Sequence, residues 1–509
     1  MENAHDDEDG QKAFIAFLAE PKTHGGAPVR HIRTPISHIF LAGTRAWKLK
    51  RARRTHFLDY SCLASRRAAC EAEVRLNRRT APALYLGMRP LIRDKGGLAI
   101  GRLDDKRGEV VDWLVEMRRF ADDALLSQQA ARGPFKDGLV DQLADAIAAF
   151  HHGEAPRRDM GGAKEMARIF RELHTALARL DPPVGHAVLA RWGGAMEKML
   201  AAQQERLDAR RAAGLVRHCH GDLHLGNICL WQGRPLPFDA IEFSEAMAVT
   251  DIAYDLAFLL MDMVHKNQGP AANRLVNRYL EQMGDYDGVA LYPLFMSIRA
   301  GVRALVTCWA GEKEAGAGYL TLAAALTERS ARPRLVALGG LSGSGKSTLA
   351  RALAPRLGRD IGAIRLSSDG VRKRLCGAPL EQPLPDACYD AATSRRVYAT
   401  LARDARQVLA SGRDVIADAT FLRPESRAAI AAVAAACNAD FHGFWLALEW
   451  RAAAERVARR GADASDATPA VVARQAGLKT GPLDWTPVDM AAPLAASLAA
   501  VLRALATVS

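Results

Sequence analysis

Residues 340–347 read GLSGSGKS, a spacing of glycine, lysine and serine that suits the binding of phosphate groups. The apolar stretch RLVALG precedes it and the helical pattern STLARALAP follows. Glycines let the backbone curl so that its N–H groups point at phosphate oxygens, and the positive end of a helix adds to the attraction. We expect Lys346 to reach the β- and γ-phosphates and the Ser347 hydroxyl to lie on Mg²⁺. The other expected contacts to the nucleotide are Gly340, Ser342, Gly343, Ser344, Gly345 and Thr348.

Further charged residues lie where later strands of this region end. Asp369 and Asp418 follow two apolar strands, and acids at the carboxyl ends of parallel strands face the ligand crevice. Arg456 and Arg460 precede a polar stretch suited to close as a lid and to neutralise a transferring phosphoryl group, although at least one arginine of that helix is expected on its surface. Residues 333–500 thus resemble P-loop kinases of the gluconate-kinase-like, zeta-toxin-like and polynucleotide-kinase-like groups.

A second constellation lies in HCHGDLHLGN, residues 218–227. Asn227 follows Asp222 at the interval that lets one loop present a carboxylate to an acceptor hydroxyl and an amide oxygen to Mg²⁺. A zinc cage would need further ligands, usually at CxxC or HExxH spacing, and the stretch has neither. The interval therefore indicates a catalytic loop.

With TDIAYDLAFLL downstream, this motif resembles the aminoglycoside phosphotransferase branch of the kinase-like fold. The resemblance implies that Asp222 is the catalytic base and Asn227 a metal ligand. It further implies that His220 and His224 are positional, and that Asp255 is a helix residue that steadies the loop.

The same resemblance, which covers about 25–325, implies a second metal-binding acid. Asp239 has the offset from Asn227 nearer to that of the family, and Glu242 is the alternate. We expect both acids on one strand, PLPFDAIEF, where they would point to opposite faces.

The resemblance also implies a lysine that pairs with the ATP phosphates and a glutamate partner on a helix. Lys48 in RAWKLK and Glu73 are the expected pair. Lys50 and Glu71 are alternates, because strand residues two apart share a face.

The elements around these residues follow from apolar periodicity. ISHIFLAG and RAWKLK predict a β-hairpin, after which a helix capped by Asp59 or Ser61 ends before Pro82. Three short strands follow, and about 138–330 is mostly helical. Beyond it LVALGG, AIRLSS, DVIADAT and FHGFWLAL alternate with helices, which indicates a parallel sheet. We expect a multidomain chain: an α+β two-lobed protein-kinase-like domain followed by an α/β P-loop NTPase domain.

The expected boundaries are a disordered tail over 1–24, a kinase-like domain over 25–327, a linker over 328–334 and a P-loop domain over 335–509. The linker, ERSARPR, carries a proline and three arginines between blocks of different pattern. Such boundaries usually carry few contacts, so each block is expected to fold alone.

Composition limits the setting of the 509-residue chain, which is 49% hydrophobic and 25% charged. Its most apolar segment, AMAVTDIAYDLAFLLMDMV, contains three aspartates and predicts a buried helix rather than a membrane span. The acidic N-terminus is unlike a secretory signal, and the eight cysteines without a CxxC pair suit reduced thiols, so we expect a cytoplasmic protein without a membrane partner. Rich Arg and Ala content suits a bacterial source.

The combination of domains resembles bacterial fusions of an aminoglycoside phosphotransferase-family domain with an ATP-binding domain. We expect an ATP- and Mg²⁺-dependent kinase with two nucleotide sites and small hydroxyl-bearing acceptors. The net charge of +12 keeps a polynucleotide or RNA-end kinase as an alternative for the C-terminal domain, although nucleic acid is not the favoured partner. A regulatory ATP-binding protein is a further alternative, against which the intact Asp222 and Asn227 argue.

Overall fold

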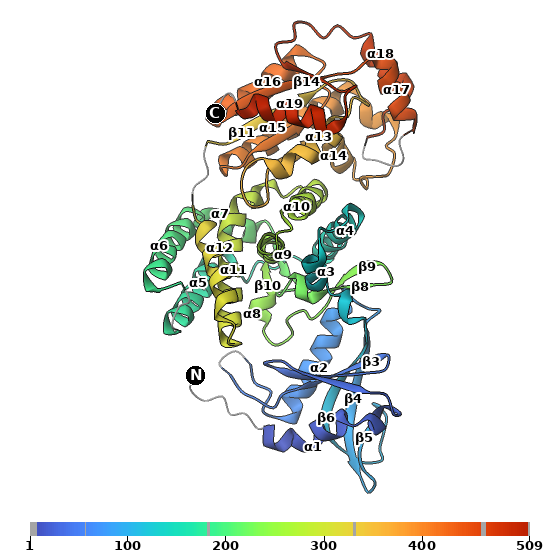
Figure 1. Ribbon diagram of the computed structural model, residues 1–509, viewed down its shortest axis with the longest axis vertical. Coiled ribbons are helices and arrows are strands. Elements are labelled where there is room, and N and C mark those ends of the chain that lie inside the picture. Colours follow the sequence, from blue (N-terminus) through green and yellow to red (C-terminus); the bar gives the residue numbers. More distant parts are fainter. Residues whose placement is uncertain (1–7, 56–57, 181–183, 329–331, 460–464, 507–509) are drawn as a thin grey trace. The chain divides into compact units, whose positions relative to one another are not determined.

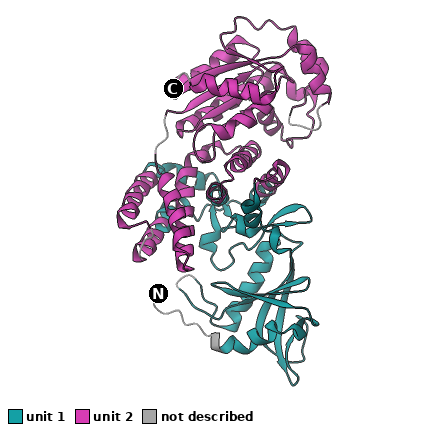
Figure 2. Ribbon diagram, in the orientation of Figure 1, with its two compact units in different colours: residues 1–133, 149–169, 202–259 teal, residues 134–148, 170–201, 260–509 magenta. Residues whose placement is uncertain are grey.

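The computed structural model describes residues 8–55, 58–180, 184–328, 332–459 and 465–506. The chain forms two compact units, shown in Figure 2. Unit 1 comprises residues 1–133, 149–169 and 202–259, and unit 2 comprises residues 134–148, 170–201 and 260–509.

Unit 1 opens with an antiparallel sheet in the order β1-β2-β3-β6-β4-β5 (Figure 1). Its strands are β1 (Val29–Arg33), β2 (Ser37–Ala42), β3 (Arg45–Lys50), β4 (Tyr85–Asp94), β5 (Gly97–Ile100) and β6 (Glu109–Arg118). The expected hairpin is confirmed, because β2 and β3 pair directly from Ala42 and Arg45 onward.

Helices cover both faces of this sheet. Leu18 of α1 (Glu8–Ala19) packs with Leu49 and other residues of one face. Val74 of α2 (Leu63–Asn77) packs with Ala46 and other residues of the opposite face. Because side chains alternate along a strand, Lys48 and Lys50 share the α2 face with Ala46.

The beginning of the chain differs from the expected tail over 1–24. From residue 8 onward that expectation is wrong: α1 is followed by η1 (Pro21–His24), and the buried Gln11 side chain donates to the Lys50 carbonyl and to Asp112. Residues 1–7 lie outside the described residues. The apolar face of α1 finds a partner only in the folded sheet, which a local reading of a polar terminus misses.

The cap of α2 is also different from the expected one. Cys62 precedes the helix and accepts from the Ser65 N–H, so neither Asp59 nor Ser61 is the capping residue. Asp59 instead accepts from Ser61, closing the turn before the helix.

The remainder of unit 1 is helix-rich and carries two small antiparallel ribbons. The pairs are β7 (Val216–His218) with β10 (Val249–Asp251) and β8 (Ile228–Trp231) with β9 (Arg234–Pro237). The short elements around them are η2 (Asp122–Ala124), α3 (Leu126–Arg132), α7 (Gln204–Ala212), η3 (Leu225–Asn227) and α8 (Glu245–Ala248). Sequence periodicity missed β7 and β10, which are too short to show alternation.

Long helices make the first part of unit 2, and several of them begin or end in unit 1. They are α4 (Asp137–Gly153), α5 (Gly162–Arg179), α6 (His186–Ala202), α9 (Ile252–His265), α10 (Gly269–Met283), η4 (Tyr286–Leu291), α11 (Tyr292–Trp309) and α12 (Lys313–Ala325). The expected buried helix is confirmed as α9, where residues 252–263 are all buried.

One segment, Tyr286–Trp309, is long and apolar enough to cross a membrane by length and composition alone. It is 72% buried within the protein over the decisive window. A core helix passes the same test, so this is weak evidence for a membrane span.

The P-loop part of unit 2 is a parallel sheet in the order β12-β13-β11-β14-β15. The strands are β11 (Arg334–Gly339), β12 (Ile364–Ser367), β13 (Val415–Asp418), β14 (Asp440–Ala447) and β15 (Thr486–Asp489). The helices are α13 (Lys346–Leu353), η5 (Ala354–Arg356), α14 (Ser368–Leu375), η6 (Asp386–Tyr389), α15 (Ala391–Ala410), α16 (Pro424–Ala436), α17 (Trp450–Arg459), α18 (Pro469–Ala476) and α19 (Leu494–Ala506). Helices α13 and α19 share an apolar core with the sheet. The expected α/β parallel sheet is confirmed, with β15 as an additional strand.

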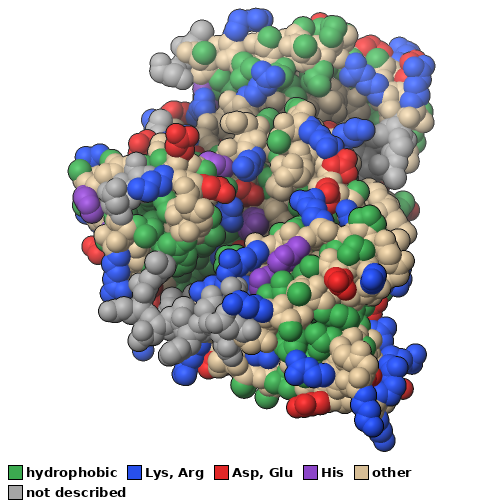
Figure 3. Space-filling model, turned by 60° about the horizontal axis from the view of Figure 1, so that its bottom comes forward, with side chains coloured by type: hydrophobic (Ala, Val, Ile, Leu, Met, Phe, Trp, Pro, Cys, Tyr) green, Lys and Arg blue, Asp and Glu red, His purple; other side chains and the backbone are tan. Residues whose placement is uncertain are grey.

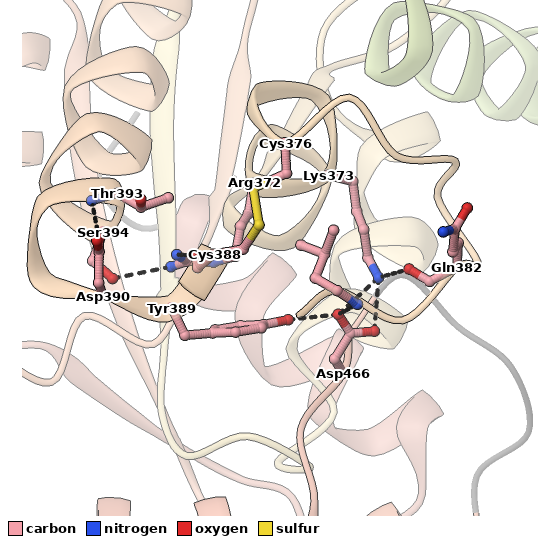
Figure 4. Close-up of a disulfide and its surroundings, with 11 residues drawn as sticks. Arg372, Lys373, Cys376, Gln382, Cys388, Tyr389, Asp390, Thr393, Ser394 and Asp466 are labelled. Atoms are coloured by element: carbon pink, nitrogen blue, oxygen red, sulfur yellow. Dashed lines mark hydrogen bonds and ion pairs between the residues drawn. A yellow bond between two sulfur atoms is a disulfide. The ribbon is translucent and has the colours of Figure 1, made fainter. Parts of the chain in front are cut away.

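The region around α14 contains a disulfide that composition did not indicate. Cys376, directly after α14, is bonded to Cys388 in η6 (Figure 4). The expectation of reduced thiols is therefore wrong for this pair, whereas the other six cysteines are free. The intervening chain turns back and brings the two cysteines together, which a separation of 12 residues does not reveal.

The expected linker over 328–334 is only partly described. Residues 329–331 lie outside the described residues, and β11 already begins at Arg334.

Candidate functional site

The first candidate site begins with two buried lysines of β3. Lys48 Nζ lies 2.9 Å from Glu73 Oε1 on α2 and also contacts Asp239. Lys50 contacts the other oxygen of Glu73 and, in addition, Glu242. The two lysines therefore share one partner, as residues on one face of a strand can.

Glu73 is the partner that the fold selects over Glu71. Burial alone would raise the pKa of Glu73, but the ammonium groups of Lys48 and Lys50 hold that pKa at about 2. Glu71 is 52% exposed and pairs with Arg67 on the surface of α2 at 2.9 Å. The expected contact between Lys48 and Glu73 is thus present, and its role in ATP binding stays a prediction.

The acids after β9 lie on a loop rather than on a strand. β9 ends at Pro237, and Asp239 adopts φ = 64°, a conformation unusual outside glycine. Hydrogen bonds from α2 and β4 hold the turn, because Ala240 N donates to Asn77 Oδ1 at 2.8 Å and Asp239 N donates to the Tyr85 hydroxyl at 3.2 Å. The expectation of one strand with two opposite faces is therefore wrong.

Both acids turn toward the lysines, but only one is open to a ligand. Asp239 contacts Lys48 and its side chain is 39% exposed. Glu242 is 3% exposed, contacts Lys50 and accepts from the Tyr60 hydroxyl at 2.7 Å. Accessibility therefore favours Asp239 as the metal ligand and gives Glu242 a neutralising role.

The loop between β7 and β8 closes on itself around the expected base. Asn227 Nδ2 donates to Asp222 Oδ2 at 2.8 Å and to the Asp222 carbonyl at 3.0 Å. His224 caps η3 by accepting from Gly226 N at 3.0 Å. The five-residue interval thus places a carboxylate and an amide side by side.

The base of this loop is fixed from α9. Asp255 accepts from the N–H groups of His220 and Gly221, at 3.1 and 2.8 Å. His151, at the end of α4, lies 3.1 Å from the same carboxylate. Burial lowers the pKa of His220, whose Nε2 lies 3.0 Å from the Phe238 carbonyl. These contacts agree with positional roles for His220 and Asp255.

His151 was not foreseen, because its partner is far away in the sequence. His151, Cys219 and Asp255 bring possible metal-ligating atoms within 4.8 Å of one another. Both Asp255 oxygens already accept backbone hydrogen bonds, however. The cluster therefore anchors the loop in this structure.

The second candidate site is the turn between β11 and α13. Gly340, Gly343 and Gly345 have φ values of 138°, 80° and 94°. A Cβ on Gly343 would lie 2.4 Å from the Ala453 carbonyl oxygen, so this position needs glycine. Lys346 Nζ donates to the carbonyls of Gly340 and Leu341 at 3.1 and 2.8 Å. The loop is thus curled with its lysine folded over it.

Other residues of the predicted phosphate contact set lie around this curl. The Ser344 side chain is buried, whereas Ser347 is half-buried and Thr348 is exposed at the start of α13. Ser342 N donates to Gln475 Oε1 at 2.8 Å, and Gln475 donates back to the Ser342 hydroxyl. Sequence spacing did not indicate Gln475, on α18, because it lies 133 residues from Ser342.

Two acids stand at the carboxyl ends of neighbouring strands beside the loop. Asp418 ends β13, and Asp369 follows β12 in the first turn of α14. Burial, together with the charge of Asp418, raises the pKa of Asp369. Among the described residues, the buried Asp418 Oδ2 has no hydrogen-bond partner. Two close carboxylates, one with an unsatisfied oxygen, fit a divalent cation, for which the Ser347 hydroxyl would be a further ligand.

The arginines of α17 have different surroundings. Arg456 donates to the Met490 carbonyl at 2.8 Å, and its guanidinium lies near Gly345. Arg459 is 84% exposed and Arg456 is exposed as well, which agrees with the expectation of at least one surface arginine in this helix. Arg460 lies outside the described residues.

The chain after α14 is fastened beside this site (Figure 4). Lys373 Nζ donates to both oxygens of Asp466, at 2.7 and 2.8 Å. The Tyr389 hydroxyl donates to the same carboxylate, and Arg372 donates to the Cys388 carbonyl at 2.6 Å. This network joins segments far apart in the sequence, so spacing alone did not indicate it.

Comparisons with known proteins agree with this division. Residues 124–292 match the phosphotransferase enzyme family (APH), and residues 335–480 match an AAA domain family (AAA_33). Uncharacterized proteins of Mycobacterium bovis and Mycobacterium tuberculosis are 31% identical to the chain over 470 residues, which cover 89% of this chain and 91% of each relative.

Solved structures are similar to either half of the chain. A choline/ethanolamine kinase family protein from Mesorhizobium loti covers 63% of this chain and 94% of its own, at 16% identity and a TM-score of 0.39. A gluconokinase from Sinorhizobium meliloti covers 36% and 99%, at 23% identity and 0.25. The APS kinase of Mycobacterium tuberculosis covers 34% and 98%, at 20% identity and 0.27.

The long match to the mycobacterial proteins extends over both domains, and both family matches are to phosphotransferase or P-loop domains. The chain therefore belongs to one family with these mycobacterial proteins, and it is a kinase whose own APH-type phosphotransferase domain precedes a P-loop kinase domain.

Proposed function

We propose that the chain is an ATP-dependent phosphotransferase with two nucleotide sites, each of which transfers the γ-phosphoryl group to a hydroxyl of a small molecule. One observation carries the proposal. Each unit holds its own buried lysine beside carboxylates: Lys48 near Asp239 in unit 1, and Lys346 near Asp369 and Asp418 in unit 2. The lysine and the carboxylates of each proposed site belong to the same unit.

In unit 1 the acceptor hydroxyl would bind beside Asp222. Asp222 takes the hydroxyl proton while the acceptor oxygen forms a bond to the γ-phosphorus and the bond to the ADP oxygen breaks. Asn227 holds the Asp222 carboxylate in place through the 2.8 Å hydrogen bond. Lys48 turns from Asp239 to a phosphate, while Glu73 keeps it on the α2 face. Bound Mg²⁺ would neutralise phosphate charge beside Asn227 and Asp239.

In unit 2 the phosphates would occupy the curl of residues 340–347. The backbone N–H groups and Lys346, released from the Gly340 and Leu341 carbonyls, bind them. Asp369 accepts the proton of the acceptor hydroxyl, and Arg456 lies close enough to Gly345 to stabilise phosphate charge. Asp418 and the Ser347 hydroxyl would hold Mg²⁺.

The stoichiometry of Mg–ATP binding tests the two-site proposal. Calorimetry on the intact chain should give about two sites, Lys346→Ala about one, and the double variant with Lys48→Ala about none, because each lysine binds the phosphates of its own nucleotide. A single site in the intact chain, lost on changing either lysine, would mean that both lysines serve one nucleotide and would refute the proposal.

Transfer of ³²P from ATP to a panel of sugars, amino alcohols, aminoglycosides and oligonucleotides then identifies the acceptors. We expect labelled small alcohols. If only oligonucleotides are labelled, and if Lys346→Ala abolishes that labelling, the C-terminal domain is instead a polynucleotide kinase.

A further inference from the structure

The edge strand of the P-loop sheet packs against helix α10, which carries none of the proposed nucleotide-binding residues. β12 stands at the end of the strand order, so the outward N–H and C=O groups of its edge need partners. In unit 2 that side is covered by α10, which contacts β12 and α14. Figure 1 labels α10 and α14.

Two asparagines of α10 bind the backbone at the start of this edge: one N–H group of β12 and two carbonyl groups of the segment just before it. Asn273 Nδ2 donates to the Ile361 and Ala363 carbonyls at 2.6 and 3.0 Å. Asn277 Nδ2 donates to the Ala363 carbonyl at 3.2 Å, and its Oδ1 accepts from Arg365 N at 2.6 Å. The asparagine side chains are only 3% and 4% exposed. Their amides thus hold the beginning of β12 and the backbone that leads into it.

One helical turn further on, Glu281 reaches the first turn of α14. Its carboxylate pairs with Arg365 at 3.0 Å, and its carbonyl accepts from Arg374 at 3.3 Å. A Cβ on Gly370 would lie 2.2 Å from Glu281 Oε1, so the close approach depends on glycine at that position. Gly370 directly follows Asp369, the proposed base of this site.

We propose that α10 is a positioning element of the P-loop site, in which Asn273, Asn277 and Glu281 fix β12 and the first turn of α14 and thereby the place of Asp369. Helix α10 lies within residues 124–292, the range that matches the phosphotransferase family. A helix of the first family region therefore belongs to the working structure of the second. The catalytic part of this inference rests on the proposed function, whereas the structural part does not.

A neighbouring residue of α10, at the border of the stripe of Asn273, Asn277 and Glu281, supplies a matched control. Arg274 pairs with Asp137 and Asp141 of α4, at 2.7 and 2.6 Å, rather than with the P-loop sheet. Arg274→Ala therefore loosens the same helix without removing a contact to β12.

Hydrogen exchange on the full chain tests the structural part. In Asn273→Ala/Asn277→Ala the amides of β12 and α14 should exchange about tenfold faster, because buried partners of the edge strand are lost. Exchange in β13 and in the unit 1 sheet should stay unchanged. Unchanged exchange in β12 and α14, or an equal increase in Arg274→Ala, would overturn the proposal. If the double variant does not fold, Glu281→Ala replaces it, with the increase expected in α14.

Steady-state ATP turnover tests the catalytic part, with Asp222→Asn in every variant to silence transfer in unit 1. Glu281→Ala should lower kcat about tenfold, since a displaced Asp369 loses its orientation, and leave the KM for ATP within about twofold because residues 340–347 are untouched. Glu281→Gln, which can still bond Arg365, should restore most of kcat. A rise in KM without loss of kcat would contradict the positioning role. Absence of turnover in the parent chain would count against the proposed function, and the exchange experiment would still decide the role of α10.

Discussion

At the scale of single residues, Lys48 of unit 1 contacts two acids whose surroundings differ. Lys48 contacts the buried Glu73, which stays charged, and Asp239, which is open to solvent. A nucleotide phosphate can replace Asp239 without displacing Glu73. The ATP-binding residues and the expected base, Asp222, are thus separate groups, and their effects should be separable by mutation.

Asp222→Asn should reduce phosphoryl transfer by unit 1 by a factor of about 10² to 10⁴, because a positioned general base contributes that much to the rate. ATP affinity should stay within a few-fold, since Lys48 and Glu73 are intact. Transfer rates and calorimetry in a Lys346→Ala background measure both quantities. Unchanged turnover would remove Asp222 from the mechanism.

Replacing Asp239 and replacing Glu242 should have different effects on activity and stability. Asp239→Ala should abolish Mg²⁺-dependent transfer in unit 1 without unfolding it, because Asp239 is partly exposed. Glu242→Ala should chiefly destabilise the fold, since it leaves Lys50 and the Tyr60 hydroxyl short of a buried partner, at a cost of roughly 3 kcal/mol or more. Activity and thermal unfolding of both variants check this. Activity that survives in Asp239→Ala and is lost in a folded Glu242→Ala would reverse the assignment.

At the scale of elements, buried charge joins β3, α2 and the loop that follows β9. Lys50 is fully buried between Glu73 and Glu242, and Asn77 and Tyr85 hold the backbone at Asp239. The strand and the helix are thereby fixed to the loop that carries the proposed metal ligand.

This network predicts a pH dependence of stability. The pKa of Glu73 is lowered from 4.5 to about 2 in the folded protein, so its contribution is present above about pH 4.5 and is lost as the pH falls toward 2. The difference in free energy of unfolding between wild type and Glu73→Gln should therefore narrow over that range. Chemical unfolding from pH 6 to 3 measures it. The exposed Glu71→Gln serves as control, and a pH-independent difference would contradict the assignment.

At the scale of the whole molecule, basic side chains do not by themselves indicate nucleic acid. On the face shown in Figure 3, Lys and Arg side chains are interspersed with acidic and apolar ones. Several arginines are paired within the fold, such as Arg210 with Asp251 and Arg334 with Asp414. The charges within each such pair cancel, so the net charge of +12 is an excess of basic over acidic side chains and does not count cations open to nucleic acid.

The contacts of α10 change the expectation that both blocks fold alone when separated at residues 328–334. A fragment of residues 335–509 would expose the edge of β12, whereas a fragment of residues 260–509 would keep α10. We expect the longer fragment to be more stable by roughly 2 kcal/mol or more, because several buried hydrogen bonds are retained. Urea unfolding of both fragments tests this, and equal stabilities would show that α10 is dispensable.

The sequence by itself determined those parts of the two sites whose residues are only a few positions apart. The phosphate loop and the interval between Asp222 and Asn227 are local, so their residue types and spacing suffice, and the alternation in β3 placed Lys48 and Lys50 on one face. The parallel sheet of the P-loop domain likewise followed from short apolar strands between helices.

Only the tertiary structure decided which partner each of these groups has. Glu71 and Glu73 are two residues apart on a helix and so point to different sides, and the sheet determines which side is buried. The open position of Asp239, the anchor formed by His151 and the disulfide of Cys376 all depend on long-range contacts. Asn273, Asn277 and Glu281 repeat every four residues, a polar stripe that local sequence assigns to solvent. In the fold this stripe is buried against β12, because an edge strand offers backbone groups that polar side chains can satisfy.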